Sequence, residues 1–378
     1  FQIDCVIKKL YQVNLRVSGF QFLRKVIKKN IVFKIKLFSE CDSSWWNEQV
    51  KILNGSMFYE YTYIKYLEFC NKQYLIKNLS YIIINDDQVV ALVIIFIENI
   101  ENRIQMSIGE NSIQSPLLKT DLAVTKINYI KNFIKVEINK LCEKYKCSLA
   151  RFQVSPFNIL ISPNVYSNLY YKWGFINQIE KNDWTDFKCK ESFVINLETT
   201  KEILWSKIRK SYKSIINQNK KLNIETKVIN YENVDLNLFD KYSETHNKIK
   251  SNKRNKENFD FNLNLIKEKK QTIFLCIDHN KIIGSFVALH YNRLVYYNSG
   301  YTNNDDNLLR PGHLLFWHAI KYFNEKKYKY FLLGGLIDKK IPNCTDKEIN
   351  ISFYKSGWGG LIIPWEHAEK KYQVNRKI

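Results

Sequence analysis

Two stretches far apart in the chain follow one pattern, in which two apolar runs rich in β-branched residues flank a polar two-residue turn. The first stretch is YIIINDDQVVALVIIF at residues 81–96, and the second is TIFLCIDHNKIIGSFVALHY at residues 272–291. Apolar runs of strand length on either side of a short polar turn predict antiparallel hairpins. The repeat therefore predicts a chain built from two copies of one unit.

The rest of each half fits this duplication, because both halves combine the hairpin with helices, further strands and a glycine-containing turn. Apolar residues at helical spacing predict helices at residues 58–69, 122–145, 165–178, 204–222, 238–269 (with a polar break near 251–255) and 314–324. Further strands are expected at residues 148–154, 225–229, 294–301, 328–333 and 361–364. The expected fold is α+β: a basic N-terminal segment of unassigned structure (1–40), a first unit (41–190) and a second unit (191–378), with a seam near residues 180–191.

The charge of the chain points to an anionic partner. Lysine and arginine number 58 against 37 acidic residues, which gives a formal net charge of +21. An excess of this size favours nucleic acid, an anionic membrane face or a phosphorylated substrate. A generally lysine-rich solvated surface is the alternative explanation.

Several other classes of protein are disfavoured. The eight cysteines have irregular spacings without a Cys-x-x-Cys pair or an accompanying histidine cluster, so we expect reduced thiols and no metal site. The most apolar run, residues 89–97, has the length of a strand and not the ~20 residues of a membrane-spanning helix. The first residues lack the pattern of a secretion signal. We expect a cytoplasmic protein, or one held peripherally at the inner face of the membrane.

Four stretches, in this order, resemble a known family. They are YYKWGF (170–175), FVINLETTKEILWSKIRKSYKSIINQNKK (193–221), YYNSGYTNNDDNLLRPGHLLFWHAI (296–320), and LLGG (332–335) followed by FYKSGWGG (353–360). Together they resemble the GNAT acyltransferase fold. Its tandem duplication resembles the Fem family, the peptidoglycan-bridge aminoacyltransferases and their acyltransferase relatives.

The resemblance implies two tandem GNAT-like domains with mostly antiparallel central sheets, and transfer of an acyl or aminoacyl group to an amine. The donor would be aminoacyl-tRNA or acyl-CoA, used as a co-substrate without a tightly bound cofactor. The acceptor would be a nucleotide- or lipid-linked cell-envelope precursor, either a peptidoglycan stem peptide or an amino sugar of a surface polysaccharide. One stretch departs from the family: SIQSPLLKTDL (112–122) places Lys119 near the position of the family's acceptor-binding acid, with Asp121 just beyond.

Acyl transfer needs donors for the carbonyl oxygen as it gains charge. In the GNAT fold these are backbone N–H groups of a splayed central strand, which corresponds here to residues 295–300. Ser299 and Gly300 would permit an irregular backbone at this point, and Tyr297 is carried over as a lining residue. An ordinary core strand is the alternative.

The loop after this strand is where a GNAT domain binds pyrophosphate, because the following helix presents free N–H groups. Here the stretch is LRPGHLLFW, in which Arg310 and Gly312 stand at the wrong spacing and Pro311 removes a donor. This weakens the case for coenzyme A. Arg310 remains a candidate phosphate ligand or a plain surface residue, and His313 could approach the site from the start of the helix.

Lys355 is the strongest single candidate. The matching lysine of the family lies beside the acyl donor's terminal ester, where a fixed positive charge stabilises the leaving oxygen or a phosphate. Tyr354 would form a wall or stack on a terminal base, and Trp358 lies among glycines that would let backbone approach the ligand. The alternative is a solvated lysine on a turn.

The predicted helix at 204–222 carries many basic residues. Arg209 and Lys213 would share a face at i,i+4 spacing, with Tyr212 alongside. This face suits a diphosphate or a nucleic-acid backbone, and in the family a basic residue and a tyrosine on this helix bind acceptor phosphates. A solvated helix face is the alternative.

No general base can be assigned from spacing. A second class of function stays open: a non-catalytic duplicated GNAT-like module that binds RNA or an anionic surface through its basic helix. Turnover that depends on Lys355 would separate the two classes.

Overall fold

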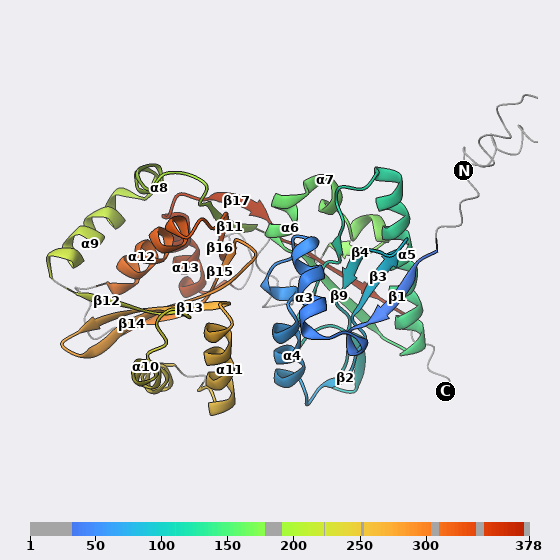
Figure 1. The fold of residues 1–378 in the computed structure, drawn as a ribbon, viewed down its shortest axis with the longest axis horizontal. Coiled ribbons are helices and arrows are strands. Elements are labelled where there is room, and N and C mark those ends of the chain that lie inside the picture. Colours follow the sequence, from blue (N-terminus) through green and yellow to red (C-terminus); the bar gives the residue numbers. More distant parts are fainter. Residues whose placement is uncertain are drawn as a thin grey trace, which may run out of the picture.

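Two groups of sheets and helices lie side by side along the long axis of the molecule in the computed structural model (Figure 1). The structure describes residues 32–109, 111–177, 191–222, 224–250, 253–303, 310–337 and 344–373. We call residues 32–177 with the strand at 366–371 the first unit, and residues 191–364 the second unit. The predicted α+β class is confirmed. Residues 1–31 of the predicted N-terminal segment and residues 180–190 of the predicted seam fall outside the described residues. The rest of that segment belongs to the first unit, as strand β1 (Lys34–Leu37) and the 3-10 turn η1 (Phe38–Glu40).

The first unit contains two sheets. The smaller has the order β1-β3-β4-β8 and the larger the order β10-β18-β9-β6-β5-β2, with β7 paired to β9. Its strands are β1 (Lys34–Leu37), β2 (Leu75–Asn78), β3 (Tyr81–Asn85), β4 (Gln88–Val93), β5 (Phe96–Ile100), β6 (Arg103–Met106), β7 (Ile113–Gln114), β8 (Leu117–Leu118), β9 (Leu149–Val154), β10 (Ile176–Asn177) and β18 (Glu366–Lys371). Its helices are α3 (Ser43–Ile52), α4 (Tyr61–Cys70), α5 (Val124–Lys144), α6 (Pro156–Ile161) and α7 (Pro163–Tyr166), with 3-10 turns at η1 (Phe38–Glu40), η2 (Met57–Tyr59) and η3 (Tyr171–Trp173).

The second unit is built on one seven-stranded sheet with the order β12-β13-β14-β15-β16-β11-β17. Its strands are β11 (Glu191–Asn196), β12 (Glu225–Ile229), β13 (Gln271–Asp278), β14 (Lys281–Tyr291), β15 (Leu294–Thr302), β16 (Tyr330–Leu336) and β17 (Leu361–Pro364). Its helices are α8 (Lys201–Lys207), α9 (Lys210–Lys221), α10 (Leu236–Ile249), α11 (Lys256–Lys267), α12 (Pro311–Glu325) and α13 (Asp346–Ser356). Helix α12 packs against β13, β14 and β15 and completes the core on that face.

Both predicted hairpins are present. Strands β3 and β4 meet at Asp86 and Asp87, and β13 and β14 meet at His279 and Asn280. All four turn residues have positive φ, between 43° and 64°. Two consecutive left-handed residues match the twist of a tight antiparallel hairpin, and Asp and Asn tolerate this conformation.

Three of the predicted helices are wrong in extent. The segment predicted at 165–178 ends as α7 at Tyr166 and continues as a 3-10 turn that Gly174 closes at φ 79°. The helix predicted at 204–222 divides into α8 and α9, because Ile208 and Arg209 leave the helical conformation. The helix predicted at 238–269 divides into α10 and α11 at the expected polar break.

The last described strand belongs to the other half of the molecule. Strand β17 pairs with β11 at the edge of the second sheet, and the chain then crosses so that β18 lies between β9 and β10. A division at residue 191 therefore does not separate the two sheets, because residues 366–371 complete the first unit.

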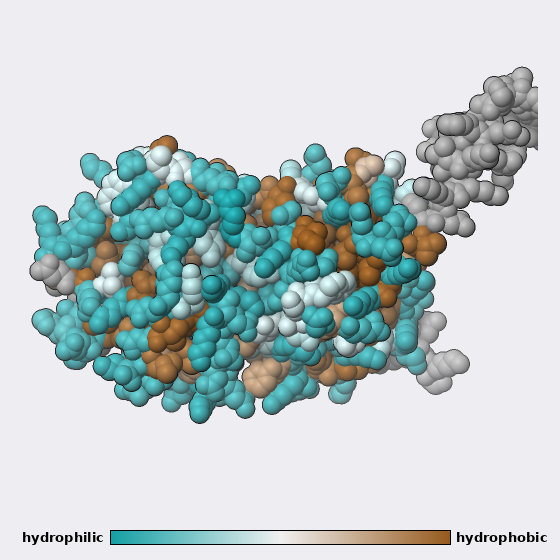
Figure 2. Space-filling model, in the orientation of Figure 1, coloured by the Kyte–Doolittle hydropathy of each residue, from teal (hydrophilic) through white to brown (hydrophobic). Residues whose placement is uncertain are grey.

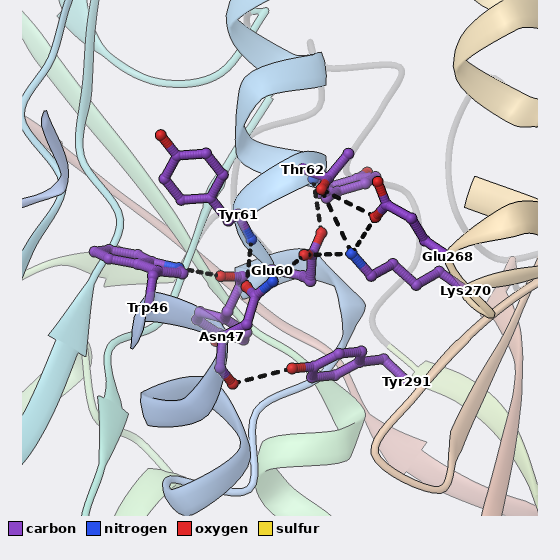
Figure 3. A network of polar contacts seen from close by, with 10 residues as sticks. Trp46, Asn47, Glu60, Tyr61, Thr62, Glu268, Lys270 and Tyr291 are labelled. Carbon is purple, nitrogen blue, oxygen red and sulfur yellow. Dashed lines mark hydrogen bonds and ion pairs between the residues drawn. The ribbon is translucent and has the colours of Figure 1, made fainter. Parts of the chain in front are cut away.

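A buried polar network also joins the units, where α4 begins (Figure 3). The Lys270 ammonium donates to the Glu60 carboxylate at 2.5 Å and also contacts Glu268. Glu60 is fully buried. Nearby, the Tyr291 hydroxyl donates to the Asn47 carbonyl at 3.1 Å. The face of the molecule seen in Figure 2 is mostly hydrophilic, with apolar residues in separate patches.

Candidate active site

The sheet of the second unit opens between two neighbouring parallel strands. Strands β15 and β16 pair only at three positions, the last being Tyr296 with Leu332. Strand β15 nevertheless continues to Thr302, and β16 to Leu336. Among the described residues, no strand pairs with this edge of β15 beyond Tyr296. The two strands thus diverge and leave a backbone edge for a ligand.

A β-bulge lies at the same place. Tyr297 pairs with Ala288 and Ser299 pairs with Val287, so Asn298 is an additional residue in β15. The irregular backbone expected around Ser299 is present one residue earlier. Bulges bend a strand and re-aim its groups, and they are frequent next to active sites.

Tyr297 lies on the face of the sheet that α12 covers. Its ring packs at 4.7 Å from Phe286 and 5.0 Å from Phe316, measured between ring centroids. Burial raises the pKa of the phenol to about 12, so the hydroxyl stays protonated at neutral pH. Tyr296 points to the opposite face, where its ring is 5.2 Å from Phe58 of the first unit.

Lys355 lies in the last turn of helix α13. The alternative of a solvated lysine on a turn between elements therefore does not describe its position. Its ammonium donates to the Gly335 carbonyl at 2.9 Å, at the end of β16. Gly334 has φ 88°, and a Cβ there would come within 3.1 Å of the Lys355 Nζ atom. A glycine pair therefore makes room for the ammonium where β16 has diverged from β15.

An aromatic cluster fills the space between α13, α9 and α12. Trp358 is 1% exposed, and its ring stacks on Phe316 at 5.1 Å and 16°. Tyr354 lies 4.9 Å from His313 and 5.6 Å from Tyr212. Burial, followed by the positive charge of Arg310, lowers the pKa of His313 to about 4, and burial raises that of Tyr354 well above its usual value. Trp358 is thus a packing residue, and this cluster is uncharged at neutral pH.

The glycines around Trp358 serve close packing of the chain. A Cβ on Gly357 would lie 2.2 Å from the Tyr212 ring, and one on Gly359, at φ 77°, would lie 2.5 Å from the Lys207 Cβ. Both values are below any ordinary contact between carbon atoms. From the sequence we expect these glycines to let the backbone approach a ligand. In the structure they let the backbone approach helices α8 and α9 instead.

The basic residues predicted on one helix face are separated. Arg209 precedes α9, and its guanidinium donates to the Tyr212 hydroxyl at 3.1 Å and to the Ser356 hydroxyl at 3.2 Å. It also stacks on the Phe353 ring at 3.9 Å. The Lys213 ammonium turns the other way and donates to the Ser206 carbonyl at 2.9 Å. Arg209 and Tyr212 therefore adjoin the end of α13, and Lys213 does not.

Arg310 is the residue before α12 and adopts a left-handed conformation at φ 39°. Its side chain is exposed. Residues 304–309 of the predicted phosphate-binding loop fall outside the described residues. The Arg310 carbonyl accepts a bond from the Asn219 amide of α9 at 3.4 Å.

A cavity of about 500 Å³ lies between the units and reaches the divergent strands. Tyr296 and Gly335 line it from the second unit, so it meets the end of β16 that Lys355 contacts. Its other described lining residues are Phe58, Tyr63, Leu67, Asn71, Ile94, Ile108, Gly109, Asn111, Ser112, Gln114, Gln153, Trp365 and His367. This volume is ordinary for a small-molecule site. Sequence reasoning missed the cavity because its walls come from both ends of the chain and no local spacing marks them.

Two further properties are limited to the described residues. They contain no cluster of three or more histidine, cysteine or acidic side chains able to hold a metal ion. They also contain no helix that is both long and apolar enough to span a membrane.

No protein-family model and no curated protein sequence matches this chain. Solved structures do match it. FemX superposes with a TM-score of 0.66 at 11% identity, over 90% of this chain and 97% of that protein. The C-terminal domain of a protein assigned as a lysylphosphatidylglycerol synthetase of Agrobacterium fabrum gives 0.50 at 14% identity, over 75% and 81%. A tandem GNAT protein of the clavulanic acid pathway gives 0.49 at 6% identity, over 90% and 98%. At these identities the comparison establishes the fold: the chain folds as two tandem GNAT-like units, similar in structure to FemX.

Proposed function

We propose that this protein is an acyltransferase that moves an acyl or aminoacyl group from an activated donor to an amine. One observation carries the proposal. The edge of β15, the Lys355 ammonium and the cavity between the units meet where β15 and β16 diverge. Such a site offers hydrogen-bond donors, a fixed positive charge and room for a second substrate, which are the requirements of acyl transfer.

In this proposal the donor's carbonyl lies along the free edge of β15, near Ser299, and accepts bonds from backbone N–H groups there. A neutral amine held in the cavity attacks the carbonyl carbon. A C–N bond forms and the ester C–O or thioester C–S bond breaks, while the proton lost by the amine leaves with the departing oxygen or sulfur. Lys355 stabilises the negative charge on that leaving atom. Tyr297, whose phenol is protonated, packs on the face of the sheet opposite to the cavity and so helps to hold β15 in place.

For the donor we favour a nucleic-acid carrier, that is, aminoacyl-tRNA, over coenzyme A. Two lysines of α9 lie near Trp205, with the Lys213 and Lys220 ammonium groups 5.8 and 5.7 Å from the indole ring. Burial, then the charges of Lys201 and Lys220, lower the pKa of Lys321. We call Lys201, Lys213, Lys220 and Lys321 the lysine cluster. Mutual repulsion of this kind is relieved by a polyanion, and a neighbouring indole suits an unpaired base.

The acceptor we propose is an amine of a cell-envelope precursor, reached in the cytoplasm or at the inner face of the membrane. The resemblance of the four sequence stretches to the Fem family is the reason for this choice of acceptor class. In the same proposal the second unit carries the donor site, with Arg209, Tyr212, Tyr354 and Arg310 near the donor's phosphates or terminal base. The first unit supplies most of the acceptor cavity.

One set of parallel incubations tests both the reaction class and the identity of the donor. The protein is mixed with an amine acceptor and either radiolabelled aminoacyl-tRNA or radiolabelled acetyl-CoA, with and without ribonuclease. We expect label transfer from aminoacyl-tRNA that ribonuclease abolishes. Transfer from acetyl-CoA that is insensitive to ribonuclease would refute the proposal that the donor is aminoacyl-tRNA. The proposal that the protein is an acyltransferase would still stand.

The lysine cluster also favours a second candidate function, a non-catalytic module that binds RNA. It predicts RNA binding without label transfer from either donor, and no effect of Lys355→Ala on any activity. Turnover that Lys355→Ala removes, with RNA binding retained, would contradict it.

A further inference from the structure

The cavity between the units has a second property that bears on the acceptor. Its walls combine flat aromatic rings with neutral polar side chains. Phe58, Tyr63 and Tyr296 form one group of rings, with centroids 5.2 Å apart for Phe58–Tyr296 and 5.7 Å apart for Phe58–Tyr63. Trp365 and His367 form another, stacked at 5.6 Å and 26°.

The polar side-chain groups of the lining include amides, hydroxyls and a neutral imidazole. Burial lowers the pKa of His367 to about 4, so its ring is uncharged at neutral pH. The amide side chains are Asn71, Asn111, Gln114 and Gln153. Each amide both donates and accepts hydrogen bonds, which is the pattern that binds hydroxyl groups.

Part of this polar lining is already committed to the structure. Gln153 accepts a bond from the Trp365 indole at 3.0 Å and donates to the Ser112 carbonyl at 3.3 Å, so it fixes one ring and one loop. The Asn111 amide donates to the Gly109 carbonyl at 3.0 Å. These bonds hold the cavity wall in shape without a ligand.

Two polar atoms of the lining have no partner among the described residues. The Ser112 hydroxyl belongs to a residue that is 5% exposed, and neither it nor the Gln114 carbonyl oxygen makes a hydrogen bond to the part of the chain that the structure describes. An unsatisfied buried polar group is costly to stability. The two residues are separated by one position in the chain and both line the cavity, so a ligand that completes their bonds explains the pair.

We propose that the cavity binds a sugar ring, and that the acylated amine belongs to an amino sugar of a glycan and not to a peptide stem. The rings would cover the C–H faces of the sugar, and the amides with Ser112 and Gln114 would bond its hydroxyls. This inference rests on the proposed function for the reaction, but the binding of the sugar does not depend on any donor.

The test is a binding measurement on the full chain without donor. Saturation-transfer NMR and calorimetry would compare a β-1,4-linked glucosamine disaccharide with the tripeptide lysyl-D-alanyl-D-alanine. We expect the disaccharide to bind and the tripeptide not to bind. The reverse preference, or binding of neither, would overturn the sugar assignment while leaving transfer to another amine intact.

Variants at the two unpartnered groups sharpen the test. Ser112→Ala and Gln114→Leu should each weaken disaccharide binding by about fivefold, the usual effect of one hydrogen bond, without lowering the stability of the free protein. Ser56→Ala is the matched control, because Ser56 is 1% exposed, has an unpartnered hydroxyl and does not line the cavity. Equal disaccharide affinity in all four proteins would overturn the inference.

Discussion

Lys270 of the second unit places its ammonium 2.5 Å from the Glu60 carboxylate of the first unit, in a contact buried on both sides. Glu60 also accepts a bond from the Tyr63 N–H at 3.0 Å and so begins helix α4, two of whose residues line the cavity. This pair thus ties the alignment of the two units to the wall of the candidate acceptor site.

Removing one partner of this pair should strongly destabilise the protein. Lys270→Met leaves the Glu60 carboxylate buried without its cation, and we expect a loss of about 3–5 kcal/mol in the free energy of unfolding. Urea denaturation measures it. The control is Lys65→Met, which breaks the partly exposed Lys65–Glu68 pair and should cost at most about 1 kcal/mol. Equal losses in the free energy of unfolding for the two variants would show that the Lys270–Glu60 pair stabilises the protein no more than a surface ion pair does.

Gly334 is predicted to matter for turnover through its contact with Lys355. Gly334→Ala places a Cβ 3.1 Å from the Nζ atom in a residue at φ 88°, so the ammonium must move. Gly174→Ala is the control, since Gly174 has φ 79° and, among the described residues, no atom lies within 4 Å of an added Cβ. Both variants should lose about 1–2 kcal/mol of stability from left-handed strain. Only Gly334→Ala should lower the rate of transfer, and an unchanged rate would argue against the placement of Lys355.

The lysine cluster should contribute to the salt dependence of RNA binding. Replacing Lys201, Lys220 and Lys321 by glutamine should weaken tRNA binding and reduce the slope of log affinity against log salt by about 2, since each phosphate contact contributes about 0.7–0.9. The matched control replaces the exposed lysines 241, 248 and 256 of helices α10 and α11. Loss of the same slope in the control would mean that net charge, and not this surface, attracts the RNA.

His290 should make the protein acid-sensitive. Its ring nitrogens contact the Thr272 hydroxyl at 2.9 Å and the Tyr328 hydroxyl at 2.8 Å, and burial lowers its pKa to about 4. The unfolded chain, with an ordinary pKa of 6.5, binds more protons between these values. Stability should therefore fall by about 3 kcal/mol as the pH drops from 6.5 to 4. In a urea-denaturation series against pH, His290→Gln should reduce the fall in stability by about this amount, and the buried His313 and His367 should account for part of the remaining fall.

The sequence was sufficient for the repeated parts of the fold, where local signals are strong. Both hairpins follow from β-branched runs around turn residues that tolerate positive φ, and the polar break between α10 and α11 was visible. The break at Ile208 was not visible, because the sequence there has a continuous helical pattern. The helix is interrupted by a tertiary contact instead: the Arg209 N–H donates to the carbonyl of Gly357, at the end of α13, at 2.9 Å.

The candidate site was predictable only in part. Lys355 and the irregular strand near Ser299 could be located from motifs that follow one another in the chain. Tyr296, Ser112, Gln114 and Trp365 could not, because the crossing of β18 and the contact between units bring them together. The glycine-rich setting of Trp358 predicted a contact with a ligand, whereas the structure buries this ring against Phe316, because such a setting is equally suited to close helix packing.

The most direct test of the account is the rate of transfer by Lys355→Ala, measured in single turnover with radiolabelled aminoacyl-tRNA and a glucosamine-containing acceptor. Circular dichroism and urea denaturation would establish that the variant is folded. We predict a loss of about 100-fold or more, as for removal of one group that stabilises charge in a transition state, with tRNA and disaccharide binding retained. A folded variant that transfers the label at the unaltered rate would contradict the central claim.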